Sequence, residues 1–156
     1  MTGVTDDVPD ELAELDHELD RRAQRRIEPG RAALTVTICM FVLIVALMLP
    51  WTGTVAGWEV LTGARSVGFL PRLFSSTSLG FGLVGSALAL ATRWWALAWL
   101  CAVGSGFSVV NGVWAIWSRQ VGVPAGGTPA GVGMVLAALA MLVLAATWAR
   151  IAITRI

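Results

Sequence analysis

Four long runs of apolar residues make up most of the chain, and short polar or Gly- and Pro-rich segments separate them. The first run, 32–49, reads AALTVTICMFVLIVALML and carries no charged residue. As a helix it would be about 27 Å long, close to the thickness of the hydrocarbon core of a bilayer. Three further runs of the same character follow at 73–91, 94–117 and 131–149. The pattern predicts four transmembrane helices.

The connections between the runs predict how the helices are arranged. Residues 92–93 form a very short turn, and 118–130 (SRQVGVPAGGTPA) form a Gly/Pro loop. Short connections favour antiparallel neighbours, so we expect an all-α up-down bundle. The longest connection, 51–72, has Gly and Thr punctuation and two tryptophans, and we expect part of it to lie at a membrane interface.

The segment before the first run has a different composition. Residues 1–30 contain nine acids and four arginines, whereas residues 31–156 contain seven arginines and a single acid. We therefore divide the chain into a charged cytoplasmic segment, 1–30, and a four-helix transmembrane domain, 31–156. Within the first part, 9–27 is expected to form a short amphipathic helix, since acids precede arginines as the helix dipole favours. That helix could dock a partner or its own copy, or be a solvated stub of marginal helicity.

The arginines also predict the orientation. With the N-terminus inside, eight arginines fall on the cytoplasmic side and three, Arg65, Arg72 and Arg119, fall outside. This asymmetry favours a multi-pass plasma-membrane protein with both termini in the cytoplasm. Tryptophans near the span ends fit an aromatic belt at the two interfaces. They are Trp51, Trp58, Trp94, Trp95, Trp117 and Trp148.

Two rows of small residues predict where the helices approach each other closely. Both rows repeat at a spacing of four, which places their members on one face of a helix, and small residues there allow close packing. The first row is Ser78, Gly82 and Ser86, and the second is Gly104, Ser108 and Gly112.

Few polar residues outside the first segment could carry function. Glu59 is the only acid after residue 28, and a carboxylate in a membrane would be a candidate proton or ion site. Its position in a loop with Arg65 makes an ion pair or an interfacial hydrogen bond the simpler interpretation. Asn111, within the third run, is expected to hydrogen-bond to a neighbouring helix, and a role in lining a substrate path is the alternative.

The sequence predicts no catalytic, cofactor-binding or metal-ligating residue. Cys39 and Cys101 lie in apolar runs and form no CxxC pair, so we interpret them as small apolar residues rather than a redox pair. The only histidine, His17, lies in the charged segment, which leaves no imidazole for a haem or metal in the predicted membrane domain.

Several short motifs resemble a family of uncharacterised small actinobacterial, mainly mycobacterial, integral membrane proteins. They are PWTG (50–53), GWEVL (57–61), LAW (97–99), WAIWSR (114–119) and WAR (148–150). The resemblance extends from about residue 27 to 150. It implies a four-helix plasma-membrane protein and supplies no activity or site residue.

These observations favour a non-enzymatic accessory or scaffolding subunit of a membrane complex. The expected partners are the lipid bilayer and either another membrane protein or further copies of the chain, and no nucleic acid. The alternative is a small homo-oligomeric transporter or channel that uses Glu59 and Asn111. A thiol or quinone redox enzyme would require Cys39 and Cys101.

Overall fold

The computed structural model describes residues 30–65, 67–121 and 128–154. This part is mostly helical, as the apolar pattern predicts. The expected helix at 9–27, with His17, lies outside the described residues. The four long helical segments are α2 (Gly30–Met48), a continuous second segment from Phe69 to Thr92, α6 (Trp95–Val121) and α7 (Val132–Ile153).

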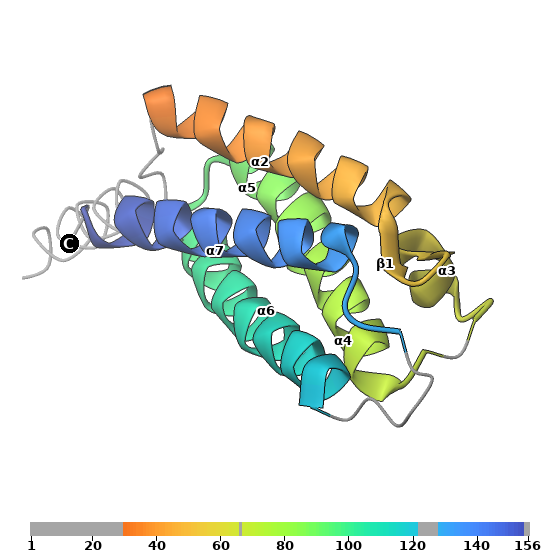
Figure 1. Cartoon of the computed structure of the whole chain (residues 1–156). Helices are drawn as coiled ribbons and strands as arrows, with labels where there is room; N and C mark the ends of the chain where they lie inside the picture. The colour runs from red at the N-terminus through yellow and green to blue at the C-terminus, as the bar shows by residue number, and fades with distance from the viewer. Residues whose placement is uncertain (1–29, 66, 122–127, 155–156) are drawn as a thin grey trace, which may run out of the picture.

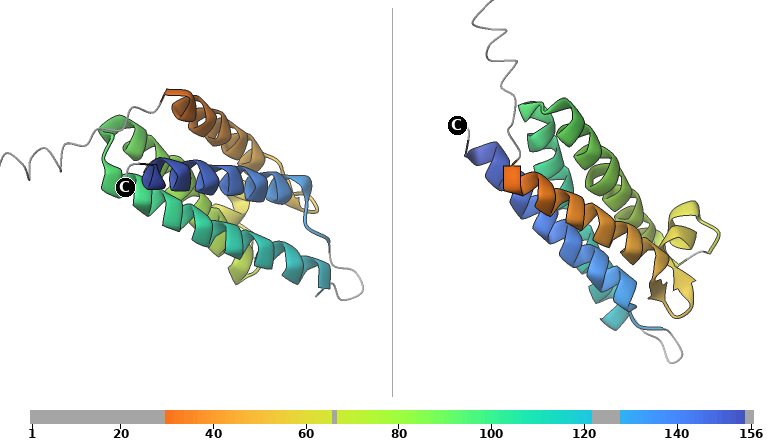
Figure 2. Two further views of the ribbon diagram at one scale, coloured as in Figure 1. Left: turned by 90° about the vertical axis from the view of Figure 1, so that its left-hand side faces the viewer. Right: turned by 90° about the horizontal axis from the view of Figure 1, so that it is seen from above.

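The long helices form a bundle in which α7 lies between α2 and α6 (Figures 1 and 2). The second segment packs along α6 and makes fewer contacts with α2. Each of the four is long and apolar enough to cross a membrane. The Phe69–Thr92 segment therefore lies next to α6, and α6 lies next to α7. The first long helix, α2, contacts the bundle mainly through α7.

The second helical segment contains a feature that the periodicity did not predict. It consists of α4 (Phe69–Thr77), the π-helix η1 (Ser78–Gly85) and α5 (Ser86–Thr92). In a π-helix each N–H bonds to the carbonyl five residues earlier, which leaves the backbone wider than in an α-helix. The Ser86 hydroxyl also donates to the Phe81 carbonyl, five residues back, at 3.2 Å. Three glycines, Gly80, Gly82 and Gly85, lie in this stretch and lower the cost of an irregular backbone.

The 51–72 connection is folded rather than an irregular loop. Strands β1 (Pro50–Thr52) and β2 (Val55–Ala56) pair in antiparallel register, Pro50 with Ala56 and Thr52 with Val55. Gly53 between them has a φ of +56°, a conformation that favours glycine. The short helix α3 (Gly57–Thr62) follows and ends at Gly63, whose φ is +74°. The second long helix then begins at Phe69, four residues earlier than the apolar run predicts.

Trp51 lies at the centre of this end of the bundle. Its indole Nε1 donates to the Ala46 carbonyl of α2 at 2.8 Å, and its ring centroid lies 5.3 Å from that of Phe74 in α4. The backbone N–H of Gly131, just before α7, donates to the Trp51 carbonyl at 2.6 Å. One residue thus joins three of the long helices.

The prediction of an aromatic belt is wrong for two of its six tryptophans. Trp51 and Trp148 are fully buried, because each indole N–H has a partner inside the bundle. The Trp148 Nε1 donates to the Ser86 hydroxyl at 3.0 Å. The other four tryptophans of the predicted belt, Trp58, Trp94, Trp95 and Trp117, are exposed on the bundle.

We predict that Gly57→Ala destabilises the bundle by about 1–3 kcal/mol, the usual cost of overpacking. A Cβ at this position would lie 2.4 Å from the Trp51 Nε1, so the indole would have to leave the Ala46 carbonyl. The measurement is thermal unfolding of the chain purified in a mild detergent. Gly106→Ala is the control, since nothing lies within 4 Å of its added Cβ, and alanine favours the helix there. Equal unfolding temperatures for the two variants would contradict this role of Trp51.

Candidate functional site

The interior of the bundle holds most of the buried polar side chains that the structure describes. They are hydroxyls and one amide, contributed by the β1 strand, the second helical segment and α6. The residues are Thr52, Ser75, Ser78, Ser86, Ser105, Ser108 and Asn111. Since buried polar groups cost free energy unless they are hydrogen-bonded, the partners of these residues indicate what the interior can do.

Ser108 of α6 is the centre of a hydroxyl cluster. Its Oγ accepts a hydrogen bond from the Thr77 hydroxyl at 3.0 Å and lies 3.0 Å from the Ser78 hydroxyl. Thr77 is the last residue of α4 and Ser78 the first of η1, so the cluster marks the point where the helix changes its winding. The three hydroxyls join the second segment to α6.

The two rows of small residues face the same interior. An added Cβ at Gly104 would lie 2.2 Å from the Phe81 ring, and one at Gly112 would lie 2.7 Å from the Phe74 ring. At Gly82 an added Cβ would lie 2.7 Å from the side chains of Leu43 and Met141. Each glycine therefore provides a notch for a large side chain of a neighbouring helix.

Some buried polar atoms of this region have no hydrogen-bond partner among the described residues. They are the Ser105 Oγ, the Asn111 Nδ2 and the Trp99 Nε1. Asn111, for which we expected a cross-helix bond, is 6% exposed and leaves its amide nitrogen unpaired. Sequence reasoning gave no indication of the Ser105 position, since its serine looks like any other in the run.

The three polar residues singled out from the sequence lie in different environments. The Glu59 carboxylate accepts the backbone N–H of Ala56 at 2.9 Å and so caps the start of α3. Arg65 is exposed beyond the end of α3, and Asn111 is buried in α6. Arg119, at the end of α6, donates to the Val67 carbonyl and holds the segment before α4.

The two cysteines are buried and free. Cys101 lies in α6, and a Cβ added at Gly85 would be 3.2 Å from its sulfur. Cys39 faces the core from α2. Both occupy positions of small apolar residues, which is how free cysteine usually packs.

Comparison with known proteins assigns the family. A family model described as the MiaB C-terminal domain matches residues 13–156, almost the whole chain. This chain belongs to the MiaB C-terminal domain family. It is also 43% identical, over 141 residues, to a tRNA-2-methylthio-N(6)-dimethylallyladenosine synthase of Mycobacterium avium (strain 104). The match covers 87% of this chain but only 20% of that relative. No solved structure matches the chain.

This family corrects the interpretation drawn from short motifs. The resemblance to an uncharacterised mycobacterial membrane-protein family is wrong, because the match along the chain is to a MiaB domain. The expectation of a non-enzymatic scaffold, and its transporter alternative, are also wrong, because the relative is a synthase and the family is that of an enzyme.

The expected partners and location are corrected by the same findings. The relative's name states a product within tRNA, so the exclusion of nucleic acid is wrong for this family. The predicted set of partners, which was the bilayer with a membrane protein or further copies and no nucleic acid, is therefore wrong as a set. The assignment to the plasma membrane with both termini in the cytoplasm is corrected too; the apolar runs had suggested this location, and the arginine count had given only the orientation. The motifs misled because they lie at helix ends and in the Trp51 region, where they serve the fold.

We predict that Ser108→Ala and Ser105→Ala of this MiaB C-terminal domain have opposite consequences. Ser108→Ala leaves the buried Ser78 hydroxyl without its partner, whereas the Thr77 hydroxyl can still donate to the Leu73 carbonyl at 2.9 Å, and the loss should lower stability by about 0.5–1.5 kcal/mol. Ser105→Ala removes a buried hydroxyl that has no partner and should be neutral or stabilising. The two serines lie three residues apart on one helix and are both fully buried, so each controls for the other. The measurement is unfolding of both variants in detergent. A larger loss of stability for Ser105→Ala than for Ser108→Ala would contradict these roles of the two serines.

Proposed function

We propose that this chain acts as the C-terminal helical domain of a tRNA 2-methylthio-N6-dimethylallyladenosine synthase, and that its four long helices cross a lipid bilayer. The observation that carries the first part is the 43% identity to such a synthase over 87% of this chain. The chain spans about a fifth of that relative, so the domain accompanies the much larger part of the enzyme that lies outside the match.

The chemistry of the bundle favours a structural role within the enzyme over a role in catalysis. Its buried polar groups are hydroxyls and an amide, which form hydrogen bonds but carry no charge near neutral pH. Several of them bond between helices, as the bonds of Ser108 and of Ser86 with Trp148 illustrate. The domain therefore holds the enzyme in place while the reaction takes place in the remainder of the protein.

The distribution of polarity supports the second part. Large apolar side chains are exposed around the bundle, whereas five serines are buried inside it. In α6, for example, Val110 is 60% exposed and Ser108 is fully buried. Water favours the reverse arrangement, and single-domain soluble proteins rarely expose contiguous apolar surface of this extent. Hydrocarbon surrounding the helices explains both the apolar exterior and the hydrogen-bonded interior.

The first part is tested by deleting the coding sequence for residues 30–154 in frame in the native host. Because the enzyme loses its helical domain, the 2-methylthio-N6-dimethylallyladenosine content of tRNA should fall severalfold. Nucleosides from digested tRNA are measured by liquid chromatography and mass spectrometry. Restoring the wild-type or the Gly106→Ala chain should restore the nucleoside. An unchanged content in the deletion strain contradicts the proposal.

The second part predicts a position-dependent effect of arginine on the exposed face of α6. Val110→Arg, near the middle of the helix, should disfavour insertion by about 2.5–3.5 kcal/mol. Trp117→Arg, equally exposed but near the helix end, should be tolerated because arginine can reach the interface there. The measurement is the fraction of chain that stays with membranes after alkaline extraction. If the wild-type chain is extracted, or the two variants behave alike, the helices do not cross a bilayer.

A further inference from the structure

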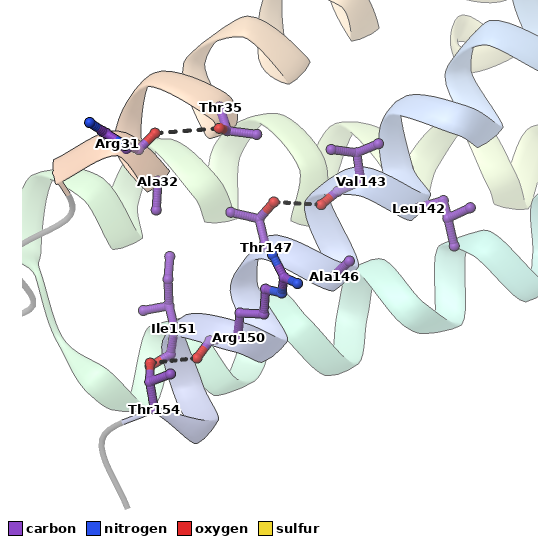
Figure 3. A pocket seen from close by; sticks show the side chains of 10 residues that line it. All are labelled: Arg31, Ala32, Thr35, Leu142, Val143, Ala146, Thr147, Arg150, Ile151 and Thr154. Atoms are coloured by element: carbon purple, nitrogen blue, oxygen red, sulfur yellow. Dashed lines mark hydrogen bonds between the residues drawn. The ribbon is translucent and has the colours of Figure 1, made fainter.

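A groove lies between the first turns of α2 and the last turns of α7, at the end of the bundle opposite Trp51. Its volume is about 610 Å³. Figure 3 shows that Arg31, Ala32 and Thr35 of α2 line one wall. The other wall is formed by α7 and its C-cap, with the residues Leu142, Val143, Ala146, Thr147, Arg150, Ile151 and Thr154. Nothing in the polar interior described above extends into it, so this is a separate site.

Two guanidinium groups supply the charge of the groove, Arg31 from α2 and Arg150 from α7. The three threonine hydroxyls that line it are already used within their own helices. Thr35 donates to the Arg31 carbonyl at 3.3 Å, Thr147 to Val143 at 2.7 Å and Thr154 to Arg150 at 2.6 Å. The arginines are therefore the groups that can bind the polar part of a ligand in the groove. The planar guanidinium group can donate two parallel hydrogen bonds to phosphate oxygens.

The remaining lining of the groove is hydrocarbon. Leu142, Val143, Ala146 and Ile151 of α7 supply it, and Leu142 and Val143 lie among the exposed apolar residues of the bundle. An apolar wall that leads away from two cations matches a ligand with an anionic head and a hydrocarbon chain. Nucleic acid would pair with the arginines but has no counterpart for this wall, which favours a lipid over RNA.

Around the groove, the described elements carry a further arginine outside the lining and no carboxylate. The Trp95 Nε1 donates to the Ala152 carbonyl at 3.2 Å, which places the start of α6, and with it Arg93, at the same end of the bundle. The only acid in the described part of the chain is Glu59, which caps α3 at the Trp51 end. No carboxylate on the described elements at the groove's end therefore competes for Arg31 and Arg150.

We propose that the groove binds an anionic phospholipid, with its phosphate between Arg31 and Arg150 and one acyl chain along Leu142, Val143 and Ala146. This inference rests on the proposed membrane placement, since that is what brings the groove to lipid. It adds a specific ligand site to a domain whose exterior otherwise has only non-specific contact with hydrocarbon.

Native mass spectrometry of the intact chain in a neutral detergent tests the site, with phosphatidylglycerol and phosphatidylcholine of identical chains as probes. Wild-type chain should bind phosphatidylglycerol about tenfold more tightly, since each arginine near an anionic head contributes measurably. The double variant Arg31→Gln/Arg150→Gln should lose this preference. Arg93→Gln is the matched control: it removes a cation from the same end without altering the groove, and should keep the preference within about twofold.

Further arms separate the competing explanations. Ala146→Phe, which fills the apolar wall, should weaken binding of both lipids while the fold, read from helical circular dichroism, is retained. Equal binding of the two lipids, or an Arg93→Gln loss as large as that of the double variant, overturns the site. Full displacement of lipid by glycerol phosphate or by tRNA overturns the lipid as the occupant. Because binding is measured in detergent, failure of membrane placement in cells is detected separately by alkaline extraction.

Discussion

The burial of Trp51 is the interaction on which one end of the molecule depends. Its indole donates to the end of α2, its ring contacts Phe74 of α4, and its carbonyl accepts the backbone before α7. A buried indole N–H without a partner would cost about 1–3 kcal/mol, so the bond to the Ala46 carbonyl is a condition for placing the ring there. Gly57 and Gly133 leave the space that the ring occupies, since a Cβ at either would lie under 3 Å from it. The hairpin and α3 are thus part of the bundle's packing and not an appendage.

Along the rest of the bundle, small residues and hydroxyls supplement a buried apolar core that includes Leu43 of α2 and Met141 and Leu144 of α7. Phe81 occupies the notch at Gly104, and the hydroxyls of Thr77 and Ser78 bond to Ser108 nearby. The π-helix begins at this cluster, and its wider winding adjusts which side chains face α6. In the proposed membrane placement, lipid would supply no hydrophobic drive between helices, so close packing and interhelical hydrogen bonds would hold the bundle together.

The chain is similar to part of a tRNA-modifying enzyme, although no side chain of the bundle indicates that chemistry. The motifs that suggested a different family, PWTG and GWEVL, build the Trp51 region and carry no chemistry. Short motifs therefore gave no indication of the MiaB family, whereas similarity along nearly the whole chain identified it. Both ends of the bundle are net basic: Arg31, Arg93 and Arg150 lie at one end, and Arg65, Arg72 and Arg119 lie with Glu59 at the other.

The sequence alone determined that there are four long helices and which of their residues are apolar, because helix length and hydropathy are local properties that a continuous stretch of chain displays. It also indicated that the two rows of small residues share a helix face, since that follows from the helical repeat. Only the tertiary structure decided that Trp51 and Trp148 are buried, that Glu59 caps α3, and that the helix changes to π winding at Ser78. It likewise decided that Arg31 and Arg150 line one groove. Each of these depends on contacts between segments far apart in the chain, and a local pattern carries no information about which distant segment will supply the partner.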